Sequence, residues 1–276
     1  MDILKNEGMD NVENYMNLQE SMDFITNLSS GIIGAGIGTA WGLVFGTIFG
    51  PMGSIIGAVS GTVIEKVLCK ACTEIKDKTL SRREKIRSSV TAIYAISKIA
   101  KGIQEGNNIR NDDFFIEDYF ERSNADELFE GIIISAQKEY EENKLQYYGN
   151  LFASIVFIKD ISRSMVCQLM RLGQELSYSE LCLLSIFGRK GEGELINLRK
   201  ESYGSGSYDE NLISVLTSIN KLSSNSLIFS PTFGSLLVGI TPNEIYLQGI
   251  GVALYTYMKL KEIPEEDCKY FLELLE

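Results

Sequence analysis

Few residues of this chain have the side chains and spacing that catalysis or metal binding requires. Its 276 residues include no histidine, so the most common general base and metal ligand of proteins is missing. Among five cysteines, only Cys69 and Cys72 lie close together, as Cys-Lys-Ala-Cys on an expected helix. A redox or zinc pair would need a thioredoxin-like strand context or two further ligands nearby, and neither is visible. We expect buried or incidental thiols in a reducing compartment, with reversible acylation as the alternative.

The charge balance argues against nucleic acid as a partner. The chain has a formal net charge of −11, with 26 Lys and Arg against 37 Asp and Glu. Nonspecific affinity for phosphate backbones depends on cationic contacts, so such an acidic chain binds them poorly. No paired nucleophile and base is apparent either. We therefore expect a protein that is not an enzyme, with no catalytic residues, no cofactor, no metal and no bound nucleic acid.

The most specific pattern in the sequence is the spacing of glycines inside an apolar stretch. Between Asp23 and Glu65, 41 consecutive residues carry no charge. Glycine recurs there at every fourth residue, and the series resumes after a break at Gly50-Pro51. On a helix, residues four apart lie one above another, so each series forms a stripe that another backbone can approach closely. The predicted helix-contact residues are Gly34, Gly38, Gly42, Gly46, Gly50, Gly53, Gly57 and Gly61, with Pro51 at the break.

Gly50-Pro51 predicts the point where this segment folds back into a helical hairpin. Glycine favours a helix C-terminus, and proline is accommodated at the first position of the next helix. The first arm, residues 31–49, would be roughly 28 Å long, close to the hydrocarbon thickness of a bilayer. The second arm is uncharged only over residues 52–64, which makes it a marginal span. We predict a glycine-zipper hairpin that inserts conditionally; a permanent anchor and a Gly-packed soluble core are the alternatives.

A basic segment follows the apolar stretch. Residues 65–101 contain ten Lys and Arg against four Asp and Glu. A hairpin returns both of its ends to one side of the bilayer, and cations would hold that side at the cytoplasmic leaflet. A solvated helix face is the alternative, because charges of opposite sign also stand at i,i+4 spacing. The expected membrane-surface cations are Lys76, Lys78, Arg82, Arg83, Lys85 and Arg87.

The elements that position these residues are expected to be mainly helical. Apolar residues recur at three- and four-residue intervals over residues 88–104 and 125–157, with breaks or caps at residues 106–108 and Asn124. The aromatic residues between 114 and 157 are expected in a core. The first residues are acidic rather than cationic, so no secretory signal is expected. The predicted parts are an acidic segment at 1–23, the glycine-zipper hairpin at 24–68, a helical middle domain at 69–165 and a C-terminal domain at 166–276.

The C-terminal third predicts a mixed α+β domain. A helix over 177–188, a glycine-rich loop, a helix running into a short strand over 210–230, and a strand, turn and helix over 239–260 follow one another. This order resembles a winged helix-turn-helix domain. The helix that would enter a DNA groove, residues 209–222, offers two acids against Lys221 alone, whereas a base reader needs Arg, Lys, Asn or Gln at base edges. We therefore expect a winged-helix-like module that binds protein.

A glycine-zipper hairpin, a helical spacer and a winged-helix-like module together resemble the layout of bacterial antiphage and abortive-infection effectors that disrupt membranes. The hairpin is also similar to glycine-zipper segments of pore-forming toxins. The resemblance implies a protein that is cytoplasmic at rest, senses a phage component, forms a homo-oligomer and inserts hairpins into inner-membrane lipid as a pore that arrests or kills the cell. A ring-shaped phage protein as trigger would template the assembly. A membrane-tethered winged-helix transcriptional regulator and a soluble helical scaffold are the rival classes.

Overall fold

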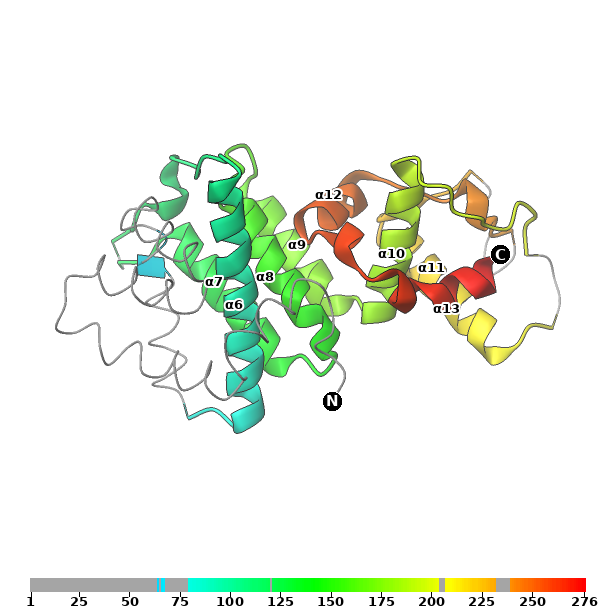
Figure 1. The fold of residues 1–276 in the computed structure, drawn as a ribbon, viewed down its shortest axis with the longest axis horizontal. Helices are drawn as coiled ribbons and strands as arrows, with labels where there is room; N and C mark the ends of the chain where they lie inside the picture. Colours follow the sequence, from blue (N-terminus) through cyan, green and yellow to red (C-terminus); the bar gives the residue numbers. More distant parts are fainter. Residues whose placement is uncertain (1–63, 65, 68–78, 120, 204–206, 232–238) are drawn as a thin grey trace. The chain divides into compact units, whose positions relative to one another are not determined.

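The computed structural model describes residues 64, 66–67, 79–119, 121–203, 207–231 and 239–276 (Figure 1). Over these residues the chain is mainly helical, with one small two-stranded sheet near its C-terminus, which confirms the predicted mainly α class. The chain divides into two compact units at Arg171 and Leu172. The predicted acidic segment and nearly all of the predicted hairpin lie outside the described residues. No helix within the described ranges is both long and apolar enough to cross a bilayer.

The first unit is a group of packed helices in which α6 contacts both α7 and α8 (Figure 1). Ser81 begins α6 through a capping box with Glu84, and Ser123 begins α7 through one with Asp126. The N-cap of α7 is therefore Ser123, and the predicted cap at Asn124 is wrong by one residue. The elements are α6 (Arg82–Gln104), η1 (Asp113–Phe115), α7 (Asn124–Lys138), η2 (Glu142–Lys144), α8 (Leu145–Ile155) and the start of α9 (Arg163–Glu175).

Helices α6 and α8 approach closely because small residues line their contact. Ala92 and Ala95 on α6 are buried, and Gly149 of α8 lies against Thr91, Tyr94 and Ala95. A Cβ added at Gly149 would lie 2.7 Å from the carbonyl oxygen of Thr91. The Thr91 hydroxyl also donates to the carbonyl of Leu145 at 3.2 Å. A side chain at position 149 would therefore force these two backbones apart.

The aromatic core predicted for this unit is confirmed in part. Phe129, Tyr147 and Phe152 are completely buried, and the rings of Phe129 and Phe152 lie 4.5 Å apart between centroids. Tyr119 and Tyr140, in contrast, are 95% and 80% exposed. Both lie in connections between helices, where the backbone runs over the surface and no facing element covers the ring.

The second unit is arranged around α10 (Tyr178–Gly191), which is buried along most of its length and contacts the other helices and β2 (Figure 1). Strands β1 and β2 pair antiparallel, with Ile228 opposite Leu247 and Phe229 opposite Tyr246. The predicted sequence of helix, loop, helix, strand, strand and helix is confirmed. The other elements are α11 (Glu210–Ser224), β1 (Ile228–Phe229), η3 (Pro242–Glu244), β2 (Tyr246–Leu247), α12 (Gly249–Tyr257), η4 (Leu260–Glu262) and α13 (Glu265–Leu275).

Replacing Gly251 by alanine is expected to destabilise the second unit by about 1–3 kcal/mol. A Cβ at this position of α12 would lie 1.9 Å from the carbonyl oxygen of Leu227, a backbone atom that already accepts a hydrogen bond from the Gln248 amide. No side-chain rotation can relieve this contact. Urea denaturation of the full chain measures the effect.

The matched control is Gly191→Ala, at the end of α10 in the same unit. A Cβ there would meet nothing within 4 Å, so the better helix propensity of alanine makes the substitution neutral or stabilising by up to about 1 kcal/mol. Equal stability of Gly251→Ala and the unmodified chain would contradict the close approach of α12 to Leu227.

Candidate functional site

The residues predicted to act at the membrane fall into two groups. The glycine series, Pro51, Lys76 and Lys78 lie outside the described residues. The other four predicted cations stand on the first turns of α6, immediately after its Ser81 cap. We call these four the α6 basic surface; they are Arg82, Arg83, Lys85 and Arg87.

One carboxylate binds two arginines of the α6 basic surface. Glu142, at the start of η2, accepts hydrogen bonds from Nε and Nη2 of Arg83 and, at 2.9 Å, from Nε of Arg87. Arg87 also donates through Nη1 to the Gln137 carbonyl at 3.3 Å, which fixes it to the end of α7. The Arg83 side chain is 57% exposed, whereas Arg87 and Glu142 are 19% and 15% exposed. Arg87 is the fixed partner of Glu142, and Arg83 is the accessible one.

A buried ion pair stands beside this cluster, in the turn between α7 and α8. The Nζ atom of Lys144 lies 2.6 Å from Oε2 of Glu139, and the two side chains are only 2% and 7% exposed. The Tyr148 hydroxyl donates to the same oxygen at 2.7 Å, and the Glu141 amide donates to Oε1. Burial raises the pKa of Glu139, but the hydrogen bonds from Lys144, Tyr148 and the amide outweigh it and hold that pKa below its usual value.

This pair lies where the apolar pattern over residues 125–157 is divided between two helices. Glu139 is the C-cap of α7, with extended backbone angles, and its side chain is held by Lys144 from the far side of the turn. A continuous helix would place residues five apart on different sides, so it would separate these two charges. The expectation of helix in this region is confirmed, with an interruption that the sequence pattern does not show.

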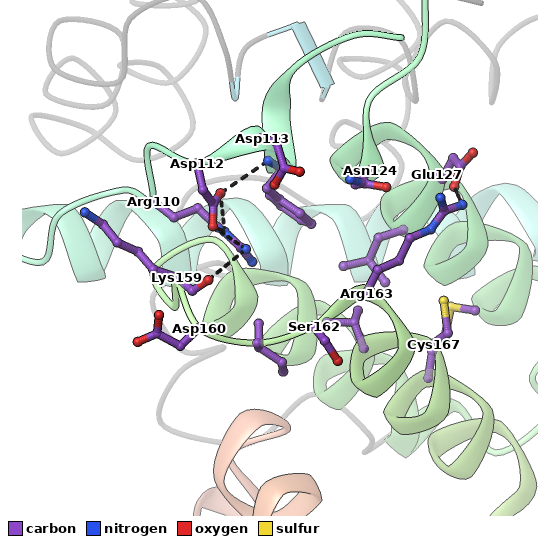
Figure 2. Close-up of a pocket in the computed structure, with 15 residues that line it drawn as sticks. Arg110, Asp112, Asp113, Asn124, Glu127, Lys159, Asp160, Ser162, Arg163 and Cys167 are labelled. Atoms are coloured by element: carbon purple, nitrogen blue, oxygen red, sulfur yellow. Dashed lines mark hydrogen bonds and ion pairs between the residues drawn. The ribbon is translucent and has the colours of Figure 1, made fainter.

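A pocket of about 470 Å³ opens in the first unit, between the N-terminal turns of α7 and α9 and the loops that precede them (Figure 2). Its volume is in the range of small-molecule sites. Apolar side chains from Phe114, Leu128, Val166 and Met170 share the lining with charged groups of both signs. The pocket was not expected from the sequence, because its walls come from three separate segments, residues 110–114, 124–128 and 159–170.

Arg110 is the buried charge of this pocket. Its Nε and Nη2 atoms bind the Asp112 carboxylate at 2.8 and 2.6 Å, and Nη2 also donates to the Lys159 carbonyl at 3.2 Å (Figure 2). The guanidinium carbon lies 4.4 Å from the Phe114 ring centroid. Hydrogen bonding from Arg110 lowers the pKa of Asp112, so this carboxylate stays ionised. Arg110 thereby joins the loop after α6 to the loop before α9.

Two other polar groups of the pocket lining, Arg163 and Ser162, also have partners. Arg163 forms an ion pair with Glu127 (Figure 2). The Ser162 hydroxyl accepts a hydrogen bond from the Met165 amide at 3.2 Å. Within the described ranges no group of three or more His, Cys, Asp or Glu is placed to hold a metal ion.

Three cysteines lie among the described residues, and they differ in burial. Cys182 and Cys268 are buried and Cys167 is half-buried, all as free thiols, which confirms the expectation for these three. A hydrogen bond with the neighbouring Cys268 and, after it, burial raise the pKa of Cys182 far above its usual value, so it remains a neutral thiol. The closely spaced Cys69 and Cys72, also expected as buried or incidental thiols, lie outside the described residues.

Helix α11 presents an outward face with little charge. Ser214 and Thr217 are exposed on it, and Ile213 is 39% exposed. The one Lys or Arg of this helix, Lys221, binds the buried Glu180 carboxylate at 2.8 Å. The Lys221 ammonium is therefore bound within the second unit, to the carboxylate that forms the capping box at the start of α10.

Comparisons with protein-family models, with curated proteins and with solved structures found no match to this chain. The cations of α6 were predictable from the sequence, but Glu142, the partner of Arg83 and Arg87, was not, because it lies 55 residues beyond Arg87. Local spacing contains no signal for such a contact.

Proposed function

We propose that this chain is an antiphage defence effector that senses a phage component, oligomerises and inserts glycine-zipper hairpins into the inner membrane to arrest or kill the cell. One observation carries the proposal: glycine at every fourth residue inside 41 uncharged residues of a chain with net charge −11. A stripe of that kind suits backbone-to-backbone packing of apolar helices. In an acidic chain, such a segment is costly unless an apolar surface eventually covers it.

The C-terminal unit is proposed as the sensor, in the form of a winged-helix-like module. The order α10, α11, β1 and β2 supports this assignment. A protein rather than DNA as its partner is supported by the face of α11, where Lys221 is bound to Glu180 and the exposed Ile213, Ser214 and Thr217 carry no charge. DNA readout depends on cations and amides that reach phosphates and base edges. The proposed trigger is a ring-shaped phage protein that could seat several copies of the chain together.

Cell fractionation before and after phage infection tests the proposal. The full chain is expected in the soluble fraction at rest and in the inner-membrane fraction, as a homo-oligomer, once a trigger phage is present. A membrane-tethered transcriptional regulator would be in the membrane at all times and would bind duplex DNA in a salt-dependent way. A soluble scaffold would never enter the membrane fraction, and either result would refute the effector proposal.

A further inference from the structure

We propose that the α6 basic surface is an anionic-lipid-binding surface and that Glu142 controls it by occupying Arg83 while the protein is in solution. This inference rests on the proposed function, because it assigns a ligand to the cations that follow the predicted hairpin. The ligand is the phosphate-bearing face of a bilayer, which arginine recognises through its forked N–H groups.

Arg83 and Arg87 differ in exposure and in the number of partners they bind. Arg87 is half-buried and is bound both to Glu142 and to the Gln137 carbonyl, so it keeps the carboxylate in place. Arg83 offers two N–H groups to the same carboxylate but leaves 57% of its side chain exposed. Its fork can therefore turn to an external phosphate without unfolding the helix.

The electrostatic consequence is a reduced attraction to membranes at rest. A cation near an anionic leaflet contributes about 1 kcal/mol to binding, but a carboxylate in contact with it cancels most of that attraction. Glu142 belongs to η2 and binds the α6 basic surface from there. Any movement that separates η2 from α6 would therefore leave the charge of Arg83 without its carboxylate. The chain would then hold to the bilayer at the side from which the hairpin enters.

Vesicle flotation of the full chain tests the role of Glu142. Glu142→Gln should bind vesicles of phosphatidylglycerol and phosphatidylcholine about fivefold more tightly than the unmodified chain, with no change on pure phosphatidylcholine. The matched control is Glu105→Gln at the other end of α6. It removes the same charge from an exposed ion pair with Lys101, so it should leave vesicle affinity within about twofold, the effect usual for exposed pairs.

Arg83→Gln completes a double-mutant cycle. In the Glu142→Gln background, Arg83→Gln should lower vesicle affinity about fivefold. In the unmodified chain it should lower the affinity less than about twofold, because Glu142 already binds the Arg83 side chain there. Equal costs in the two backgrounds would overturn the inference. If Glu142→Gln does not fold, a fivefold cost of Arg83→Gln alone would overturn it as well.

Two further results would refute the role of Glu142 independently of pore formation. One is an equal rise in vesicle binding for Glu105→Gln, which would show a simple net-charge effect. The other is a rise in duplex DNA binding for Glu142→Gln without a rise in vesicle binding. Flotation without a trigger measures only attachment. Variants that attach as expected but never permeabilise vesicles would therefore refute the pore and leave the role of Glu142 intact.

Discussion

Replacing Gly42 and Gly46 together by leucine is expected to abolish ion leakage and toxicity while leaving membrane partitioning intact. The two residues lie four apart in the predicted first arm of the hairpin. If hairpins of neighbouring subunits pack backbone to backbone, two leucines on that face would hold the helices apart by the width of a side chain. Dye or ion release from liposomes and growth of cells that carry the variant measure the effect.

Insertion itself should become easier in this variant, because each leucine favours membrane insertion by roughly 0.3–0.6 kcal/mol at a helix centre. Assembly and insertion are therefore expected to change in opposite directions. For a permanent anchor the substitution would be harmless or helpful, since an anchor needs only apolar length. The pair of measurements separates an anchor from an assembling pore.

Ala40→Leu is the matched control for this experiment. Residues two apart stand about 200° around a helix, so on the predicted helix Ala40 would lie nearly opposite Gly42 and its substitution would add apolar area on the other face. We expect normal leakage from Ala40→Leu. Full leakage from a well-expressed double glycine variant would rule out the zipper-assembled pore and favour the anchor or soluble-core alternatives.

Replacing Lys144 by methionine is expected to destabilise the first unit by about 3–5 kcal/mol at pH 7. Glu139 would keep its hydrogen bonds from Tyr148 and the Glu141 amide, but its buried charge would lose the Lys144 ammonium 2.6 Å away. Removal of one member of a buried pair costs far more than the pair contributes, because the other charge stays desolvated. Urea denaturation measures the loss, and Lys138→Met, one residue before Glu139 and exposed, should change stability by less than about 0.5 kcal/mol.

The loss should shrink as the pH falls from 7 towards 4. The folded-state pKa of Glu139 is lowered, so the carboxylate stabilises the unmodified protein above its ordinary pKa of 4.5 and that contribution disappears in acid. Without Lys144, burial would raise the pKa instead, and protonation would then relieve the variant. The double variant Glu139→Gln, Lys144→Met keeps an acceptor for Tyr148 and should recover most of the lost stability. A pH-independent loss, or no recovery, would contradict this account of the pair.

The helices and their order follow from local sequence, because hydrophobic periodicity, capping residues and Gly-Asn breaks act within a few residues. Residues 88–104 are helical throughout α6, and the chain leaves the helix at Gly106, which has a φ of 85°. The helix, strand, strand and helix order of the C-terminal third was predictable for the same reason. So were the charge of the α6 basic surface and the uncharged glycine-rich stretch, since composition alone defines them.

Only the tertiary structure decides which of these groups meet. Glu142 meets Arg83 and Arg87 across more than fifty residues, and Lys221 meets Glu180 across 41. The same holds for Gly251, which is needed because the Leu227 carbonyl lies where a Cβ would stand. Helix-forming tendency is a property of neighbouring residues, whereas ion pairs and close backbone contacts depend on how packed helices place distant residues together. The sequence therefore determines which charges this protein carries, and the packing of its helices determines which of them remain available to a membrane or a partner.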